Sequence, residues 1–134
     1  MITTIADSIA TLLNEGTGED EIVAVVDYVP DFNLRDLDER QIVIVPTGCD
    51  WDNLTRGKVS RTYVFEIGVL QRLSGEDEIE DFCESVISIG DRLKNSMIGD
   101  YRCMSVETIQ LYNPSDYKQS KKAVGVLRAR YKGL

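Results

Sequence analysis

Residues 62–69 read Thr-Tyr-Val-Phe-Glu-Ile-Gly-Val, and large apolar side chains occupy every second position of this stretch. Such alternation predicts a β-strand with one face suited to a hydrophobic core, because successive side chains of a strand point to opposite sides. The apolar positions are Tyr63, Phe65, Ile67 and Val69.

A helical period precedes this strand, between Thr4 and Glu15. Apolar residues recur there at the spacing that forms one stripe along a helix. Thr3 or Thr4 is expected to cap the helix at its start, and Gly16 to end it. The stripe consists of Ile2, Ile5, Ile9, Leu12 and Leu13.

A second helix is expected from Glu76 to Leu93, with Ser74 as its cap. Acidic residues crowd its first turns, and Arg92 and Lys94 stand at its end, which is the charge order that the helix dipole favours. The stripe expected to be buried consists of Ile79, Phe82, Cys83, Val86, Ile87 and Leu93.

Four further strands are indicated by β-branched or alternating residues, and prolines at positions 30 and 46 are expected to end the first two. The polar stretch from Thr47 to Ser60 is expected to be a long loop. The four strands are Ile22–Val29, Gln41–Val45, Tyr101–Tyr112 and Ala123–Tyr131.

This order of elements predicts an α+β fold in one domain, residues 1–134. Two helices can cover only one face of a five-stranded sheet, so we expect a two-layer sandwich. Its sheet would be mixed and mostly antiparallel, with about five strands and both helices on one face. The opposite face is then expected to be polar or to be covered by another chain.

Residue types that carry catalysis are scarce. The chain has no histidine, the commonest general base and the usual partner of a serine or cysteine nucleophile. Its cysteines (Cys49, Cys83 and Cys103) are odd in number and form no C-x-x-C pair, so we expect three reduced thiols with Cys83 in the core. No catalytic residue, cofactor site or metal site is expected, and the chain is not expected to be an enzyme. An undetected carboxylate or metal-dependent enzyme stays as an alternative.

The start of the chain carries an early acid and no basic segment, which is not the pattern of a signal peptide. No apolar run approaches the ~20 residues that a membrane span needs. We therefore expect synthesis in the cytosol and no membrane partner.

Charge divides the chain into two parts. Residues 1–55 hold twelve acids and two bases, whereas residues 56–134 hold eleven acids and thirteen bases. Such asymmetry is typical of a nucleic-acid patch or of complementary faces on a self-assembling subunit, and the excess of acid favours the second. Trp51 in a polar stretch suits an interface, although its ring could equally tuck onto the chain's own core. The candidate subunit or partner interface consists of Trp51, Arg56, Lys58, Arg61, Lys121, Lys122, Arg128 and Arg130.

This layout resembles the tail terminator (tail completion) proteins of lambda-like long-tailed bacteriophages. The resemblance covers almost the whole chain in element order and length. It rests on the opening helix, on Gln41-Ile-Val-Ile-Val-Pro-Thr-Gly48 leading into a polar stretch, on the strand at 63–70, on the acidic-headed helix and on the closing strand at 123–131. The chain departs from the family's pattern in an additional valine-rich strand before Gln41 and in a basic C-terminus.

The resemblance implies a virion protein of the neck or tail, assembled in the host cytoplasm. Copies of it would form a ring, with six as the expected number, that caps the tail tube and ends its polymerisation. Its partners would be further copies of itself, the major tail tube protein and a head-completion or neck protein, and DNA would pass through the lumen without specific binding. Two alternatives stay open: a head-completion or neck adaptor, and a nucleic-acid-binding module that uses the bases at 118–132.

Overall fold

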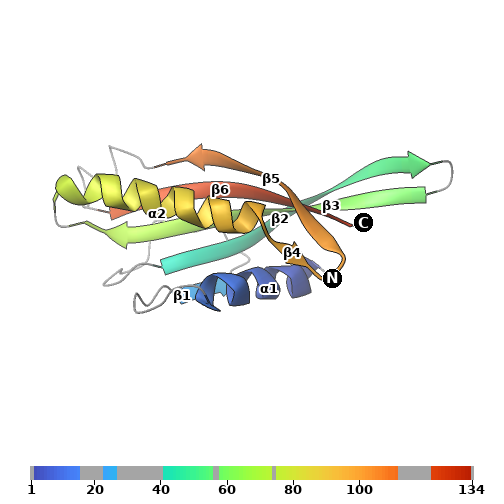
Figure 1. The fold of residues 1–134 in the computed structure, drawn as a ribbon, viewed down its shortest axis with the longest axis horizontal. Coiled ribbons are helices and arrows are strands. Elements are labelled where there is room, and N and C mark those ends of the chain that lie inside the picture. Colours follow the sequence, from blue (N-terminus) through green and yellow to red (C-terminus); the bar gives the residue numbers. More distant parts are fainter. Residues whose placement is uncertain are drawn as a thin grey trace.

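A computed structural model of the chain describes residues 2–15, 23–26, 41–55, 58–73, 75–111 and 122–133, to which all structural statements below refer. They form two helices and one six-stranded sheet (Figure 1). The elements are α1 (Ile2–Glu15), β1 (Val23–Val26), β2 (Gln41–Thr55), β3 (Lys58–Arg72), α2 (Asp77–Lys94), β4 (Met97–Ile98), β5 (Tyr101–Gln110) and β6 (Lys122–Gly133).

The sheet confirms the predicted fold class. Its strand order is β1-β2-β3-β6-β5-β4. Only the β1–β2 pair is parallel, and the other four pairs are antiparallel. The sheet has one strand more than expected. The additional strand is β4, whose two residues pair with the start of β5 across the turn at 99–100.

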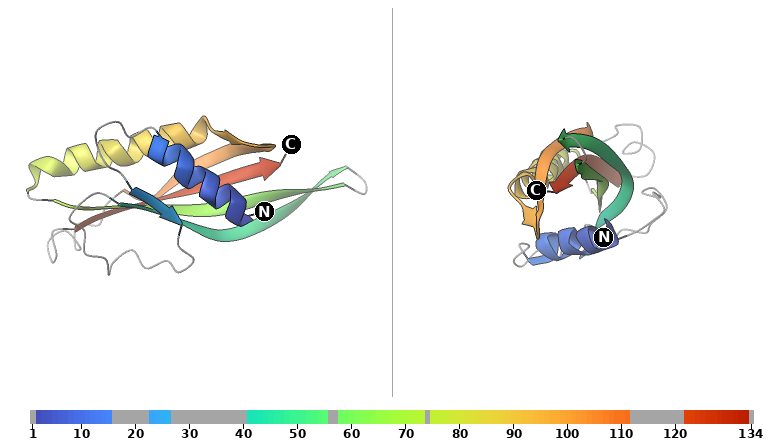
Figure 2. Two further views of the ribbon diagram at one scale, coloured as in Figure 1. Left: turned by 90° about the horizontal axis from the view of Figure 1, so that it is seen from below. Right: turned by 90° about the vertical axis from the view of Figure 1, so that its right-hand side faces the viewer.

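Both helices pack on the same face of this sheet. Ile9 of α1 and Val86 of α2 belong to one buried cluster with Phe65, Ile67 and Leu127 of the sheet. Phe65 and Ile67 stand at alternate positions of β3, as the pattern around residues 62–69 predicts, and Leu127 of β6 pairs directly with Ile67. The end-on view shows that the sheet curls (Figure 2). Helix α1 contacts β1 and β2 near one edge and β4 at the other, so it bridges the two edges of an open sheet.

The opposite face differs from the expectation that it is polar or covered by another chain. It carries a second cluster that is already buried within the chain, consisting of Val43, Val45, Leu70 and Val124. Register explains its position, because Leu70 pairs with Val124 on neighbouring strands and their side chains share a face. This face is therefore apolar around this cluster, and the charged pair Glu66 and Arg128 follows on it further along β3 and β6.

The predicted strand at Gln41–Val45 is too short, and the loop expected at Thr47–Ser60 is wrong. Strand β2 continues through Pro46 to Thr55, and β3 begins at Lys58, so the two form one long hairpin. Proline is tolerated because β1 pairs only as far as Ile44, which makes the rest of β2 an edge strand. A β-bulge follows at Pro46/Gly48, where the Thr47 hydroxyl donates to the carbonyl of Val64 at 3.3 Å.

Both helices differ from the predictions in their caps, and α2 also differs in its buried stripe. Helix α1 begins at Ile2, so Thr3 and Thr4 lie within it and cannot cap it. Helix α2 has Glu76 at its N-cap position and no side-chain cap there, and the expected cap Ser74 lies outside the described residues. The buried stripe of α2 contains Ile89 in place of Ile87, because Phe82, Val86, Ile89 and Leu93 follow helical spacing without a gap.

Candidate interaction surfaces

The β2–β3 hairpin extends past the end of the sheet as a two-stranded projection. Thr62 is the first β3 residue that pairs with β6, and its partner on β2 is Asp50. Residues 51–55 and 58–61 pair only with each other, and we call them the arm. At ~3.3 Å per residue, the five arm residues of β2 extend about 16 Å beyond the three-stranded region. The projection is visible at one end of the molecule (Figure 1).

One face of the arm exposes large apolar side chains. Trp51 pairs with Arg61 across the hairpin, and Val59 lies on the same face two residues from Arg61. Trp51 is 65% exposed and Val59 is 58% exposed. Trp51 therefore does not tuck onto the core of its own chain, and the interface role stays as its prediction. An indole held in water on a projecting hairpin is typical of a residue that a partner covers.

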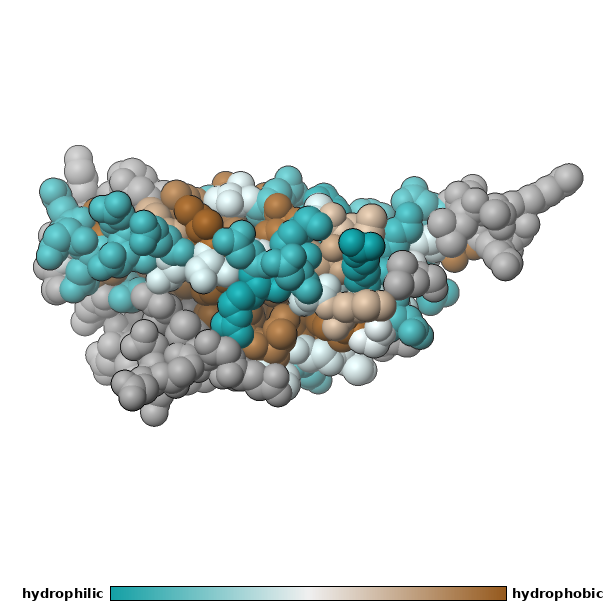
Figure 3. Space-filling view, viewed as in Figure 1, coloured by the Kyte–Doolittle hydropathy of each residue, from teal (hydrophilic) through white to brown (hydrophobic). Residues whose placement is uncertain are grey.

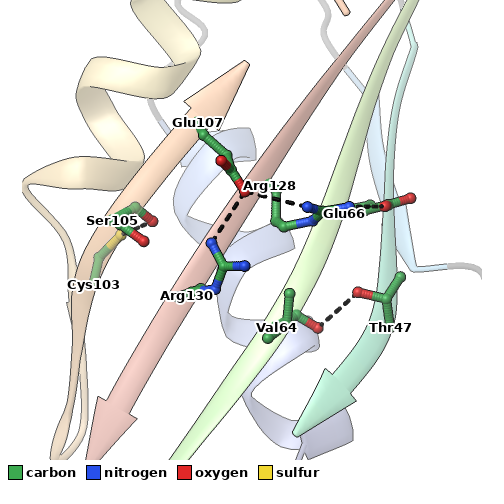
Figure 4. Close-up of polar contacts among 8 residues, drawn as sticks. All are labelled: Thr47, Val64, Glu66, Cys103, Ser105, Glu107, Arg128 and Arg130. Atoms are coloured by element: carbon green, nitrogen blue, oxygen red, sulfur yellow. Dashed lines mark hydrogen bonds and ion pairs between the residues drawn. The ribbon is translucent and has the colours of Figure 1, made fainter. Parts of the chain in front are cut away.

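The basic last strand places two of the candidate residues in an ion-pair network. Arg128 reaches Glu66 of β3 and Glu107 of β5, each at 3.2 Å, and Arg130 reaches the same Glu107 oxygen at 3.0 Å (Figure 4). The strand register produces this arrangement, because Arg128 stands between Glu66 and Glu107 in one row across three strands. The network lies on the sheet face opposite the helices.

This network shifts the pKa values of two of its members, Glu107 and Arg128, in the directions that favour their charged forms. The hydrogen bond from Arg130, and after it the one from Arg128, lowers the pKa of Glu107 below its ordinary value. The pKa of Arg128 is raised, chiefly by its hydrogen bond to Glu66. Carboxylates of the same chain thus balance part of the positive charge that the sequence places on β6.

The structure separates the candidate residues into two places. Trp51 and Arg61 lie together on the arm, and Arg128 and Arg130 lie together in the middle of the sheet. The other four candidate residues are not placed on either surface. Arg56 and Lys121 lie outside the described residues, as do the side chains of Lys58 and Lys122.

Sequence reasoning missed a second exposed apolar set, on the side of the molecule formed by α2, β4 and β5. Met104 and Ile109 are 49% and 46% exposed, and each stands at a register shift of β5. The extra residue of a β-bulge falls outside the alternating pattern, so no simple periodicity marks these positions in the sequence. The set consists of Ile87, Met97, Met104 and Ile109.

A groove lies beside this set, between α1 and β4, with a volume of about 510 Å³. Figure 3 shows apolar surface between α1 and α2 on this side, next to hydrophilic side chains. Arg92 of α2 donates to the carbonyl of Leu12 at 2.9 Å and so holds the two helices together near the groove. The lining residues are Ser8, Thr11, Leu12, Asn95, Ser96, Met97, Ile98 and Gly99.

The buried hydroxyls of Ser96 and Tyr131 are joined by a hydrogen bond. The Ser96 hydroxyl donates to the carbonyl of Leu93 at 2.6 Å, so the Tyr131 hydroxyl, also 2.6 Å away, donates to Ser96.

Burial raises the pKa of Tyr131 and that of the neighbouring Cys103 thiol. A thiol with a raised pKa holds little thiolate, so Cys103 is not an activated nucleophile. Cys103 is the fully buried cysteine, whereas Cys83 packs half-buried against the core and burial raises its pKa too.

Within the described ranges, no three histidine, cysteine, aspartate or glutamate side chains are grouped so that they could hold a metal ion. The described helices are also too short or too polar to cross a membrane.

Comparison with known proteins gives a limited result. No protein-family model matches the sequence, and no curated protein matches it. Among solved structures, the chain is similar to one from the virion of a native gene transfer agent particle, with a TM-score of 0.40 and 16% sequence identity. The similarity covers 93% of this chain and 84% of that one. A similarity of this degree carries no functional inference.

Proposed function

We propose that this chain is a structural protein of a phage-like virion that assembles into a ring. The ring would cap the tail tube, end its polymerisation and offer a docking surface to the head. The proposal is supported by the resemblance in element order to tail terminator proteins and by the distribution of exposed apolar residues. It assigns contact with other subunits to this chain and no catalysis.

The observation that carries the proposal is that the exposed apolar side chains of one chain belong to two different parts of its fold. All six large apolar side chains that are exposed in the described residues belong either to the arm or to the side formed by α2, β4 and β5. In the sheet order, three strands (β3, β6 and β5) lie between β2 and β4. Two different patches that meet between neighbouring copies form a heterologous interface, and such interfaces generate rings when the rotation closes.

The arm adds weight to this assignment. Burial of a tryptophan removes about 150–250 Å² from water, and Trp51 retains most of that area as exposed surface. At ~25 cal/mol per Å², its burial by a neighbour would contribute about 2–4 kcal/mol per contact. The rest of the interface would have to add to this contribution, because each subunit also loses translational and rotational freedom when it joins the ring.

The ion pairs on β6 count against the nucleic-acid alternative. Arg128 already holds Glu66 and Glu107 of its own chain, and Arg130 holds Glu107, so a phosphate at these two arginines would have to compete with carboxylates. Binding of duplex DNA that weakens steeply with added salt would revive this alternative.

Tail assembly in the presence and absence of the protein tests the proposal. Tubes polymerised from the major tail protein of the same particle should grow beyond their normal length without it and stop when it is added. Electron microscopy should then show it at one end of each tube. If tubes keep their normal length without it but heads fail to attach to tails, the protein is a head-completion or neck adaptor and the terminator role is wrong.

A further inference from the structure

The groove between α1 and β4 has walls that are fixed by packed elements. Helix α1 contacts β4 directly, and the Arg92 contact to Leu12 fixes the end of α1 against α2. Gly99, with φ +57°, makes the turn between β4 and β5, in a conformation that other residues adopt at a cost. The groove is therefore a preformed feature of the fold, of a size that accepts a side chain as large as an indole.

The lining of the groove suits an amphipathic ring. Leu12, Met97 and Ile98 supply apolar surface, and Met97 is 57% exposed. Methionine sulfur makes favourable contacts with aromatic rings. An indole also brings one N–H donor, which needs an acceptor when it is buried. The Asn95 amide nitrogen already donates to the carbonyl of Asp91 at 3.0 Å, which leaves its carbonyl oxygen to accept.

Thr11 supplies a second acceptor. Its hydroxyl donates to the carbonyl of Asp7 at 3.0 Å, and the oxygen keeps its lone pairs. The groove thus offers apolar contact and hydrogen-bond acceptors, while none of its lining residues is charged.

Trp51 carries the only indole ring of this chain, because it is the only tryptophan in the sequence. Its side chain is exposed on its own copy, so it does not fill the groove of its own chain. Charged side chains lie around both surfaces in both signs, so each can find an opposite partner. Those beside Trp51 are Asp50, Asp52 and Arg61, and those adjoining the groove are Asp7, Lys94, Asp100 and Arg102, all exposed.

We propose that the groove between α1 and β4 receives Trp51 of a neighbouring copy of the same chain, so that the arm of each subunit locks onto the next. This inference rests on the ring proposed above and names its contact. It predicts a repeating pair, Trp51 against Met97, at every subunit interface.

Tryptophan emission tests this pair directly, because Trp51 is the sole tryptophan and its emission moves to shorter wavelength when the ring leaves water. Purified full-length protein is diluted over the concentration range in which it assembles, and tryptophan emission and light scattering are recorded on the same samples. The emission maximum of the wild-type protein should move to shorter wavelength as the molar mass measured by light scattering rises.

Met97→Glu and Met104→Glu form a matched pair of variants. Both methionines are exposed near one another on β4 and β5, but only Met97 lines the groove. Met97→Glu places a carboxylate where the indole would lie and should weaken association at least about tenfold, as expected for the centre of an interface. Met104→Glu should retain both association and the emission shift. Unfolding midpoints close to the wild type establish that both variants fold.

Three outcomes overturn the inference while the ring proposal stands: rings that form without any emission shift, a shift that is independent of concentration, or a greater loss in Met104→Glu than in Met97→Glu. A concentration-independent shift would mean that Trp51 docks on its own chain. A protein that neither associates nor caps tail tubes overturns the proposed function, and this inference with it.

Discussion

Gly90 of α2 and Gly125 of β6 lie at the same helix–sheet contact, but a methyl group added at each meets different surroundings. A Cβ at Gly90 would come no closer than 3.6 Å, to Val106, which is ordinary contact. A Cβ at Gly125 would lie 2.8 Å from a methyl of Val86 and 2.9 Å from the carbonyl oxygen of Leu111. The second glycine therefore permits the close approach of α2 to the sheet.

The two single variants Gly90→Ala and Gly125→Ala should consequently change the free energy of unfolding in opposite directions. Gly90→Ala should raise the free energy of unfolding by about 0.5–1 kcal/mol, because alanine is the better residue within a helix. Gly125→Ala should lower it by about 1–3 kcal/mol through overpacking. Urea unfolding of the two variants checks both values, and equal signs would show that α2 does not pack as described.

Glu107 allows a prediction about pH. Its pKa is lowered in the fold by Arg130 and Arg128, so the folded chain binds a proton there less readily than the unfolded chain does. The contribution of the network is present above the unfolded pKa of about 4.3 and is lost as pH falls through the lower folded value. Glu107→Gln should lower stability at neutral pH, and its difference from the wild type should vanish in acid.

Unfolding curves between neutral and strongly acid pH measure this difference. Asp100→Asn is a suitable control, because Asp100 is an exposed acid outside the network. A Glu107→Gln difference that stays constant with pH would mean that the ion pairs contribute nothing to folding.

The sequence could not reveal these ion pairs. Arg128 and Arg130 are visibly basic, but the partners of Arg128 lie 21 and 62 positions away in the sequence and the partner of Arg130 lies 23 positions away. A slip of one residue in strand register would move every such side chain to the other face. Charge composition therefore indicated that Arg128 and Arg130 are available to a partner, whereas in the folded sheet both form ion pairs with carboxylates of the same chain.

Among helices and strands, predictability follows the strength of the local pattern. Helix α2 was predicted within one residue at each end, because its acidic start, basic end and apolar spacing agree. The second half of β2 was missed, since Pro46 and Gly48 read as breakers. Yet Cys49 and Trp51 alternate there with Asp50 and Asp52, and this period of two was the available signal.

The arm can be removed without disturbing the sheet. Asp50 and Thr62 are paired across the hairpin, so a two-residue Asn-Gly turn can join them in place of residues 51–61. The shortened chain should keep its free energy of unfolding within about 1 kcal/mol, because the arm pairs with no other strand. It should lose self-association.

Denaturant unfolding and sedimentation together measure both effects. A shortened chain that still associates would show that other surfaces make the contact. A shortened chain that fails to fold would show that the arm belongs to the core.

Taken together, the elements give a curled, open sheet, a helix bridging its edges and a projecting hairpin (Figures 1 and 2). The sequence predicted the fold class because hydrophobic periodicity determines layers. It named Trp51 and Arg61 as candidate interface residues, which stays a prediction, and it missed the groove, which arises only when α1 meets β4 and the segment that follows α2. Many acids of the N-terminal part lie outside the described residues, so the expected acidic face stays a prediction.

The central claim is that two different surfaces of one chain join neighbouring copies into a closed ring. Light scattering of the purified protein over a wide concentration range, with negative-stain microscopy of the same samples, tests it most directly. We expect one defined oligomer that appears as rings of uniform diameter. A monomer at every concentration, or open filaments of varying length, would contradict the claim.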